Sequence, residues 1–174
     1  MTRRPRPNVP GTHHVYARGN DRRVIFRDDR DRGLYLRLLG ATVVRRRWRC
    51  LAYCLMDNHV HLLLEIAEAD LAAGVQRVHG DYGRLFNERH ARSGHLFQGR
   101  YGSKLVTSDE QLWWTIAYIA WNPVTAGLVR SPDDWRWSSH GAAARGRAPR
   151  WLAQDRLLHA FSGLGGDPRE AYTR

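Results

Sequence analysis

Residues 56–65, MDNHVHLLLE, place two histidines one residue apart, after a polar Asp-Asn step and before an apolar run. Side chains of a β-strand alternate between its two faces, so one face of this stretch is uniformly apolar: Val60, Leu62, Leu64 and Ile66. The opposite face begins with His59 and His61, roughly 6–7 Å apart along the strand. That separation suits one small ion or one phosphate. The simpler interpretation is a pair of surface histidines at a strand end.

The segments around the histidine strand alternate between strand and helix patterns. Residues 48–56 are apolar at nearly every position and predict a central strand. Ser108 followed by Gln111 is a capping-box pattern that begins a helix, and Pro123 predicts its end near Asn122. The full set of expected elements is strands at 13–20, 48–56, 59–66 and 96–106, and helices at 28–47, 70–90 and 108–122.

This order, β-α-β-β-α-β followed by a helix, indicates an α+β fold. It matches the ferredoxin-like split βαβ arrangement, an antiparallel sheet, with one added helix. Two helices would cover one face of the sheet and leave the other face open. The added helix, lying across that open face, could bring further groups to His59 and His61.

The length of 174 residues suits one domain with a substantial core. We expect a flexible basic arm at 1–12, a folded domain at 13–142, and a tail at 143–174 with a short helix around 151–161. Neither a membrane span nor a signal peptide is indicated, which favours a cytoplasmic protein. Cys50 and Cys54, four apart in a strand, are roughly 13 Å apart and therefore predicted to be core residues without a disulfide.

Charge is the strongest signal in the composition. The net charge is +11, and every basic residue except Lys104 is arginine. A base-composition bias of the genome explains the ratio of arginine to lysine but not the net charge. Such an excess favours a polyanionic partner, because each phosphate that is neutralised releases condensed counterions. Nucleic acid is therefore the expected partner.

The helix over 113–122 carries two polar groups on one face. Tyr118 and Asn122 are four residues apart, which is one helical turn. An amide oxygen and two neutral imidazoles make a suitable ligand set for Mg²⁺ or Mn²⁺. A phenol beside a cation is favoured as phenolate, which can attack phosphorus. Taken singly, a tyrosine at position 118 is more often a packing residue, and an asparagine before a proline is more often a helix C-cap.

Several separated motifs together resemble a known family. NHVHLLL at 58–64, followed by YIAWNPVTAGLV at 118–129, is similar to the HUH single-tyrosine transposases of the IS200-like superfamily. Within them the chain most resembles the REP-associated tyrosine transposases. YARGNDRRVIF at 16–26, FQGRY at 97–101 and WRWSS at 135–139 also match that subgroup. The resemblance covers roughly residues 10–142.

The resemblance implies an enzyme that cleaves and rejoins single-stranded DNA at imperfect palindromes folded as hairpins. His59, His61 and Asn122 would bind the divalent metal, and Tyr118 would form a 5′-phosphotyrosine intermediate. The protein would work near the nucleoid, as a monomer or a homodimer. Candidate DNA contacts are Arg18, Asn20, Arg22, Arg23, Arg100, Tyr101 and, in the basic arm, Arg3, Arg4 and Arg6.

The chain departs from the family pattern at three places outside the proposed ligands and nucleophile. Asp57 stands where proline is usual, His140 where tyrosine is more frequent, and Trp121 at a variable position. Two other functions stay open: a metal-dependent phosphodiesterase that uses water, and a catalytically silent protein that binds DNA hairpins. A ferredoxin-like RNA binder would need exposed aromatic residues on central strands, where Trp48 and Tyr53 are the candidates, but the interleaving leucines predict that both are core residues.

Overall fold

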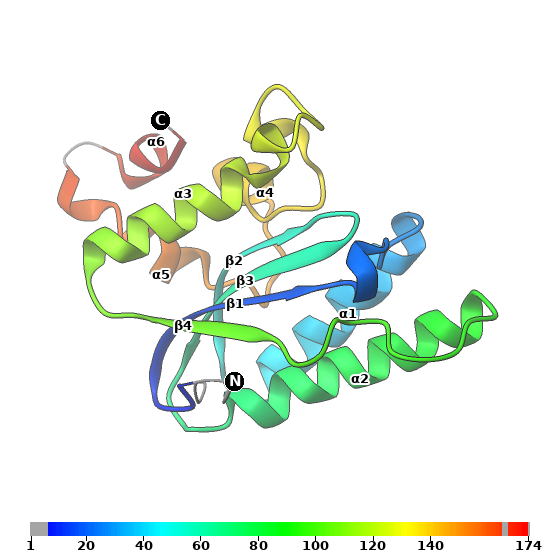
Figure 1. The fold of residues 1–174 in the computed structure, drawn as a ribbon. Coiled ribbons are helices and arrows are strands. Elements are labelled where there is room, and N and C mark those ends of the chain that lie inside the picture. Colours follow the sequence, from blue (N-terminus) through cyan, green and yellow to red (C-terminus); the bar gives the residue numbers. More distant parts are fainter. Residues whose placement is uncertain (1–6, 165–166, 174) are drawn as a thin grey trace.

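A four-stranded antiparallel sheet forms the middle layer of the molecule (Figure 1). The computed structural model describes residues 7–164 and 167–173. Its strands are β1 (Gly11–Arg18), β2 (Arg49–Leu55), β3 (His59–Ile66) and β4 (Gly102–Val106). They lie in the order β2-β3-β1-β4, and each neighbouring pair is antiparallel. This is the strand order of the ferredoxin-like fold, so the predicted fold class is confirmed.

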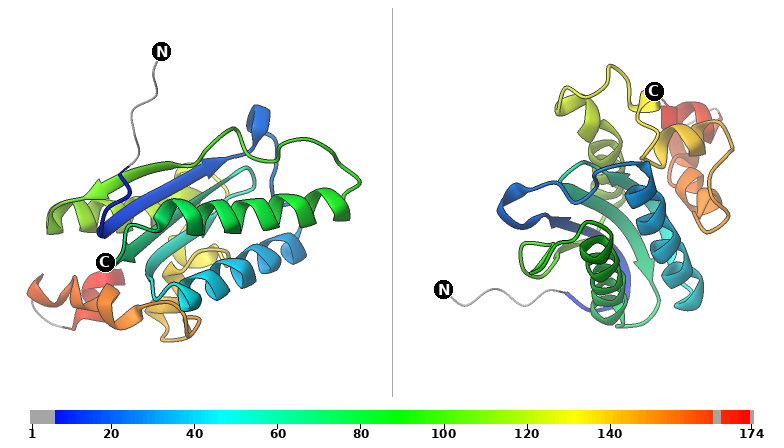
Figure 2. Two further views of the ribbon diagram at one scale, coloured as in Figure 1. Left: turned by 90° about the horizontal axis from the view of Figure 1, so that it is seen from below. Right: turned by 90° about the vertical axis from the view of Figure 1, so that its right-hand side faces the viewer.

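Two long helices, α1 (Asp29–Arg45) and α2 (Leu71–Arg89), cover one face of the sheet (Figures 1 and 2). The apolar side chains of β3 are enclosed: Val60, Leu62, Leu64 and Ile66 are at most 3% exposed. Three aromatic rings, Phe26, Tyr35 and Tyr82, meet between the helices with centroids 5.2–5.5 Å apart. Asp28 begins α1 by accepting a hydrogen bond from the Asp31 backbone N–H at 3.0 Å.

The glycines of α2 differ in what surrounds them. A Cβ added at Gly74 would lie 2.1 Å from Cη2 of the Trp48 ring, whereas one added at Gly80 would meet nothing within 4 Å. The Trp48 ring is held in place, because its Nε1–H donates to Asp70 Oδ1 at 2.7 Å. Close packing against this indole therefore requires a residue without a side chain at Gly74.

Helix α3 (Asp109–Thr125) lies across the opposite face of the sheet, as the sequence predicted. Ser108 Oγ accepts from the Gln111 N–H, but the Gln111 side chain accepts from the Thr107 N–H instead of completing the predicted capping box on Ser108. The prediction that the helix ends near Asn122 was wrong. Pro123 lies in the last turn, where its fixed φ suits a helix, and the Ala126 N–H still donates to the Asn122 carbonyl at 3.0 Å.

The C-terminal third of the chain packs beside α3 and along the outer edge of β2. It contains the short helices α4 (His140–Ala144), α5 (Gln154–His159) and α6 (Pro168–Thr173). Leu55 N–H donates to the Trp137 carbonyl, Ser139 N–H to the Tyr53 carbonyl, and Ala153 N–H to the Cys50 carbonyl, each at 2.9 Å. The 3₁₀ turns are η1 (Asn20–Arg22), η2 (Pro132–Asp134) and η3 (Ser162–Leu164).

The strand predicted at 96–106 is shorter than expected. Only Gly102–Val106 forms a strand, because residues 96–98 pair irregularly with the loop after β1: Asn20 N–H donates to the Leu96 carbonyl, and Gln98 N–H to the Arg18 carbonyl. The predicted strand at 13–20 is displaced to 11–18. Among residues 7–164 and 167–173, no helix is both long and apolar enough to cross a bilayer.

Two predictions about buried residues are confirmed. Cys50 and Cys54 are free and buried, and burial raises the pKa of the Cys54 thiol to about 12. Trp48 and Tyr53 are 5% and 4% exposed. These aromatic side chains are therefore core residues, and the RNA-binder interpretation loses the stacking surface that it needs.

Candidate active site

The strand β3 and the helix α3 bring the four predicted catalytic and metal-binding residues together. His59 and His61 emerge on the face of β3 that α3 crosses. His59 Nε2 lies 3.1 Å from Asn122 Oδ1, and the His61 and Tyr118 rings meet edge to face with centroids 5.2 Å apart. Tyr118 and Asn122, one helical turn apart on α3, thus lie opposite His61 and His59, two residues apart on β3.

A third histidine, His14 on β1, joins this group and was missed in the sequence analysis. Its Nε2 lies 3.0 Å from His61 Nδ1, and its ring lies edge-on to Tyr118 with centroids 5.8 Å apart. The signal was present in the alternation of His14, Tyr16 and Arg18 on one strand face. The pairing of Tyr16 with His61 and of Arg18 with His59 across β1 and β3 places that face beside the histidine pair.

The hydrogen bonds around His59 determine which of its nitrogens is available. Asn58 Nδ2 donates to the Arg22 carbonyl at 3.0 Å, so Asn58 Oδ1 faces His59 Nδ1 at 2.7 Å and the latter carries the proton. The lone pair of His59 Nε2 is therefore directed at Asn122 Oδ1, and two acceptors face each other. A cation would satisfy both of them, or the Asn122 amide would turn.

His61 Nδ1 lies 3.0 Å from His14 Nε2; with His14 as the acceptor, His61 Nδ1 carries the proton and the lone pair of its Nε2 is left for a ligand. Within the described ranges, no three His, Cys, Asp or Glu side chains converge as a metal-binding group. The amide oxygen of Asn122, 3.1 Å from His59 Nε2, is the candidate for a third protein ligand. Two imidazoles and an amide oxygen fit Mg²⁺ or Mn²⁺.

Burial keeps the three imidazoles neutral at neutral pH. Desolvation lowers the pKa of His61 to about 3, with further lowering by the charges of His14 and His59. It lowers the pKa of His14 to about 4, assisted by Lys104, and it also lowers the pKa of His59 against the raising effect of Asn122. The neutral imidazole is the form that binds metal ions.

These residues line an open cleft of about 750 Å³ between the sheet and α3. Its charged side chains are Arg18 and Lys104, and the lining contains no carboxylate. Tyr118 is 53% exposed at the cleft, which leaves its hydroxyl accessible. The cleft therefore offers a positive, acid-free surface to an anionic chain that approaches Tyr118.

The predicted DNA contacts are divided between different places. Arg18 lines the cleft; Asn20, Arg22 and Arg23 are exposed in the adjoining η1 turn. Arg100 and Tyr101 line a separate cavity between α2 and residues 94–101, and Tyr101 is only 6% exposed, so the structure does not bring these two to the histidines. Three further candidates lie outside the described residues: Arg3, Arg4 and Arg6.

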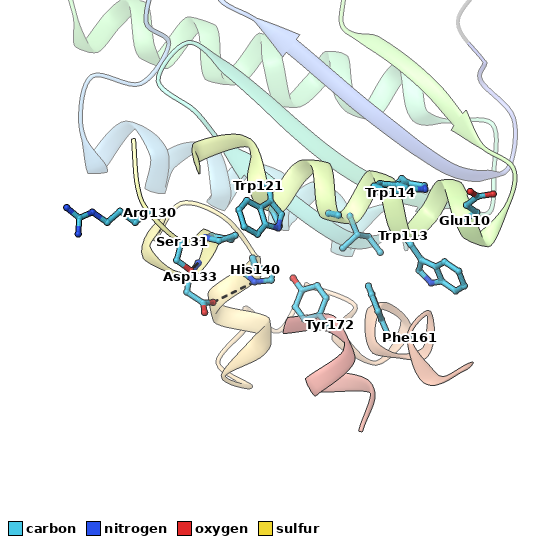
Figure 3. A pocket seen from close by; sticks show the side chains of 14 residues that line it. Glu110, Trp113, Trp114, Trp121, Arg130, Ser131, Asp133, His140, Phe161 and Tyr172 are labelled. Atoms are coloured by element: carbon cyan, nitrogen blue, oxygen red, sulfur yellow. Dashed lines mark hydrogen bonds and ion pairs between the residues drawn. The ribbon is translucent and has the colours of Figure 1, made fainter. Parts of the chain in front are cut away.

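A further cavity of about 770 Å³ lies on the other side of α3 (Figure 3). It is lined by Trp113, Trp114 and Trp121 of α3 and by Phe161 and Tyr172 of the C-terminal third. Glu110 and Asp133 stand near its two ends. His140 lies in this cavity, with its Nε2 3.7 Å from Asp133 Oδ1, and away from the cleft histidines.

The comparison with protein families identifies one family over most of the folded chain. The family described as "Transposase IS200 like" matches residues 11–122. That segment begins at β1 and ends at Asn122, so it contains His14, His59, His61 and Tyr118 as well.

Individual relatives agree with this match. A Haemophilus influenzae protein described as a REP-associated tyrosine transposase is 31% identical over an alignment 100 positions long that covers 51% of this chain. The match spans 56% of the length of that relative. A solved structure of a REP-associated tyrosine transposase bound to a REP hairpin has the same fold, with a TM-score of 0.70 at 19% identity, covering 86% of this chain and 89% of that chain.

Proposed function

Because this chain belongs to the IS200-like transposase family, we propose that it cleaves and rejoins single-stranded DNA at repeat-derived hairpins, with Tyr118 as the nucleophile. The observation that carries this proposal is the meeting of Tyr118 with His61 and of Asn122 with His59 in a cleft lined by Arg18 and Lys104. A solved relative is described as bound to a REP hairpin, which supports the choice of substrate.

The covalent step is carried by Tyr118, which lies in the cleft. The Tyr118 oxygen attacks the phosphorus of a phosphodiester and gives up its proton to solvent, which its exposure permits. The bond to the 3′ oxygen breaks, and that oxygen leaves as a 3′-hydroxyl after taking up a proton. The product is a 5′-phosphotyrosine. Attack by a 3′-hydroxyl on this link reverses the step and reseals DNA without an external energy source.

The remaining cleft residues hold the phosphate. Arg18 and Lys104 attract it, and a divalent ion held by His59, His61 and Asn122 would neutralise charge on its non-bridging oxygens. His14 fixes the orientation of His61. Binding to DNA in this way would also retain the protein at the nucleoid.

The test is a search for the covalent adduct. The protein is incubated with Mn²⁺ or Mg²⁺ and with 3′-labelled single strands from repeats beside its own gene, and the products are separated on a denaturing gel. We expect a labelled band that migrates with the protein and disappears with EDTA or with Tyr118→Phe. Tyr16→Phe is the matched control, because Tyr16 also lines the cleft and is 37% exposed.

Each other outcome selects one of the remaining functions. Cleavage without an adduct, surviving Tyr118→Phe, would support a phosphodiesterase that uses water. Tight hairpin binding by a protein that neither cleaves nor forms an adduct would support a silent DNA-binding protein. Either result would refute the tyrosine mechanism.

A further inference from the structure

Three aromatic residues stand on the outward face of α3. Trp114, Tyr118 and Trp121 are four and three residues apart, so they share one face, and they are 70%, 53% and 51% exposed. The opposite face of the helix is buried through Leu112, Ile116 and Ile119. Isolated exposed apolar residues are ordinary, but three large rings aligned within two turns mark an interaction surface.

From this arrangement we infer that Trp114 and Trp121 form a stacking platform for unpaired DNA bases on either side of the phosphate at Tyr118. The inference rests on the proposed function and specifies how the single strand is held. Along the helix axis, Trp114 lies about 6 Å before Tyr118 and Trp121 about 4.5 Å after it. Aromatic rings at such intervals stack on successive bases without regard to sequence.

The charges on the two sides of this aromatic platform favour a nucleic-acid strand. Trp114 lines both the cleft and the outer cavity, so it stands at their shared rim. On the cleft side the charged groups are Arg18 and Lys104, whereas the outer cavity is lined by the carboxylates Glu110 and Asp133 as well as by Arg130 (Figure 3). Of the two linings, only the outer one carries carboxylates, which favours phosphates in the cleft and bases over the tryptophans.

Trp113, next to Trp114, shows that not every tryptophan side chain of α3 is exposed. Trp113 is partly buried, and its Nε1–H donates to the Ala160 carbonyl at 2.6 Å, which ties α3 to the C-terminal third. The indoles of Trp114 and Trp121 make no comparable hydrogen bond within the described residues. Both rings are thus available to a ligand.

The experiment measures binding of a dye-labelled mixed-sequence single strand of twelve nucleotides by fluorescence anisotropy. Loss of one stacked base predicts a fall in affinity of about 5- to 150-fold for Trp114→Ala. Trp114→Phe should remain close to the wild-type protein, whereas Trp114→Leu, which keeps apolar bulk but no aromatic face, should fall with the alanine variant. Val44→Ala on α1 is the control, since Val44 is 68% exposed on the other helical layer.

An abasic strand separates stacking from altered folding. Two consecutive abasic positions should weaken binding to the wild-type protein but have no further effect on the Trp114→Ala/Trp121→Ala double variant. Equal affinity of the wild-type protein and Trp114→Leu would overturn the inference. So would a wild-type dimer that the double variant converts to monomer with unchanged DNA binding, because a second copy would then occupy the platform.

Failure of the platform and failure of the proposed function give different results. If the double variant still binds and forms the Tyr118 adduct as the wild-type protein does, only the platform is refuted. If no adduct forms but the abasic strand discriminates as described, the platform stands on a protein that binds DNA without tyrosine chemistry.

Discussion

Alanine substitutions at Gly74 and Gly80 should change stability in opposite directions, although both glycines lie in α2. Replacing glycine by alanine within a helix ordinarily gains about 0.8–1 kcal/mol. At Gly80 the added methyl meets nothing within 4 Å, so Gly80→Ala should gain this full amount. At Gly74 the methyl would lie 2.1 Å from one Trp48 ring carbon and 2.5 Å from another, well inside contact distance.

The net effect at Gly74 follows from two opposing contributions. Forcing extra volume into a packed core costs about 1–3 kcal/mol, with the upper part of that range expected where the neighbour is a fixed ring. Trp48 is 5% exposed and bonded to Asp70, so it has little freedom to move. After subtraction of the helical gain, Gly74→Ala should lose about 1–2 kcal/mol. The two variants should therefore differ by about 2–3 kcal/mol.

Urea denaturation followed by circular dichroism measures both changes, provided that the slope of the transition is the same for each protein. A thermal melt should show Gly80→Ala about 2–4 °C above the wild-type protein and Gly74→Ala below it. In a Trp48→Phe background, Gly74→Ala should lose less, because the smaller ring does not reach the new methyl. The reasoning is refuted if Gly74→Ala is as stable as Gly80→Ala.

Four further outcomes test the site and its surroundings. His14→Ala should weaken Mn²⁺ binding about 10- to 100-fold in isothermal titration, because His61 loses the partner that orients it; unchanged affinity would exclude a positioning role. Lys104→Gln should reduce the slope of log affinity for DNA against log salt by about one, and an unchanged slope would place the phosphate elsewhere. Burial lowers the pKa of His79 to about 4, and Tyr35 hydroxyl lies 3.1 Å from its Nε2. In the unfolded chain this imidazole takes up its proton near pH 6.5, so stability should be independent of His79 above pH 6.5 and should fall by about 3 kcal/mol as the pH falls toward 4. A His79→Gln variant with the same stability-against-pH curve as the wild-type protein would contradict this. Mn²⁺ at 100 times its dissociation constant should stabilise the fold by about 2.7 kcal/mol, reversibly with EDTA, and His59→Ala should abolish the thermal shift.

The sequence predicted most of the site because each half of it follows a local periodicity. His59 and His61 share a strand face by alternation, and Tyr118 and Asn122 share a helix face by the 3.6-residue turn. Neither relation depends on how distant segments pair. The fold class followed from the order of the elements, and the strand order β2-β3-β1-β4 then placed the two halves in contact.

The parts that were missed depend on register and packing between distant segments. His14 meets His61 only because Tyr16 pairs with His61 across the sheet, and no local pattern sets that register. Tyr101 resembled a surface residue in its arginine-rich context but is buried. Sequence rules treat Pro123 as a stop, but α3 continues past it to Thr125, since the fixed φ of proline is helical and only the hydrogen bond of its own nitrogen is lost.

The hydrogen bonds along the outer edge of β2 affect the tendency of the chain to aggregate while it is being synthesised. An uncovered strand edge presents N–H and C=O groups to any other extended chain and so promotes edge-to-edge aggregation. Residues 137–139 and 153 cover this edge, but they leave the ribosome long after β2 does. At the opposite edge, β4 is five residues long and bears Lys104, a charge that discourages such pairing. The last third of the chain therefore protects a nascent sheet that is already complete, and truncation before residue 137 should produce the form that aggregates.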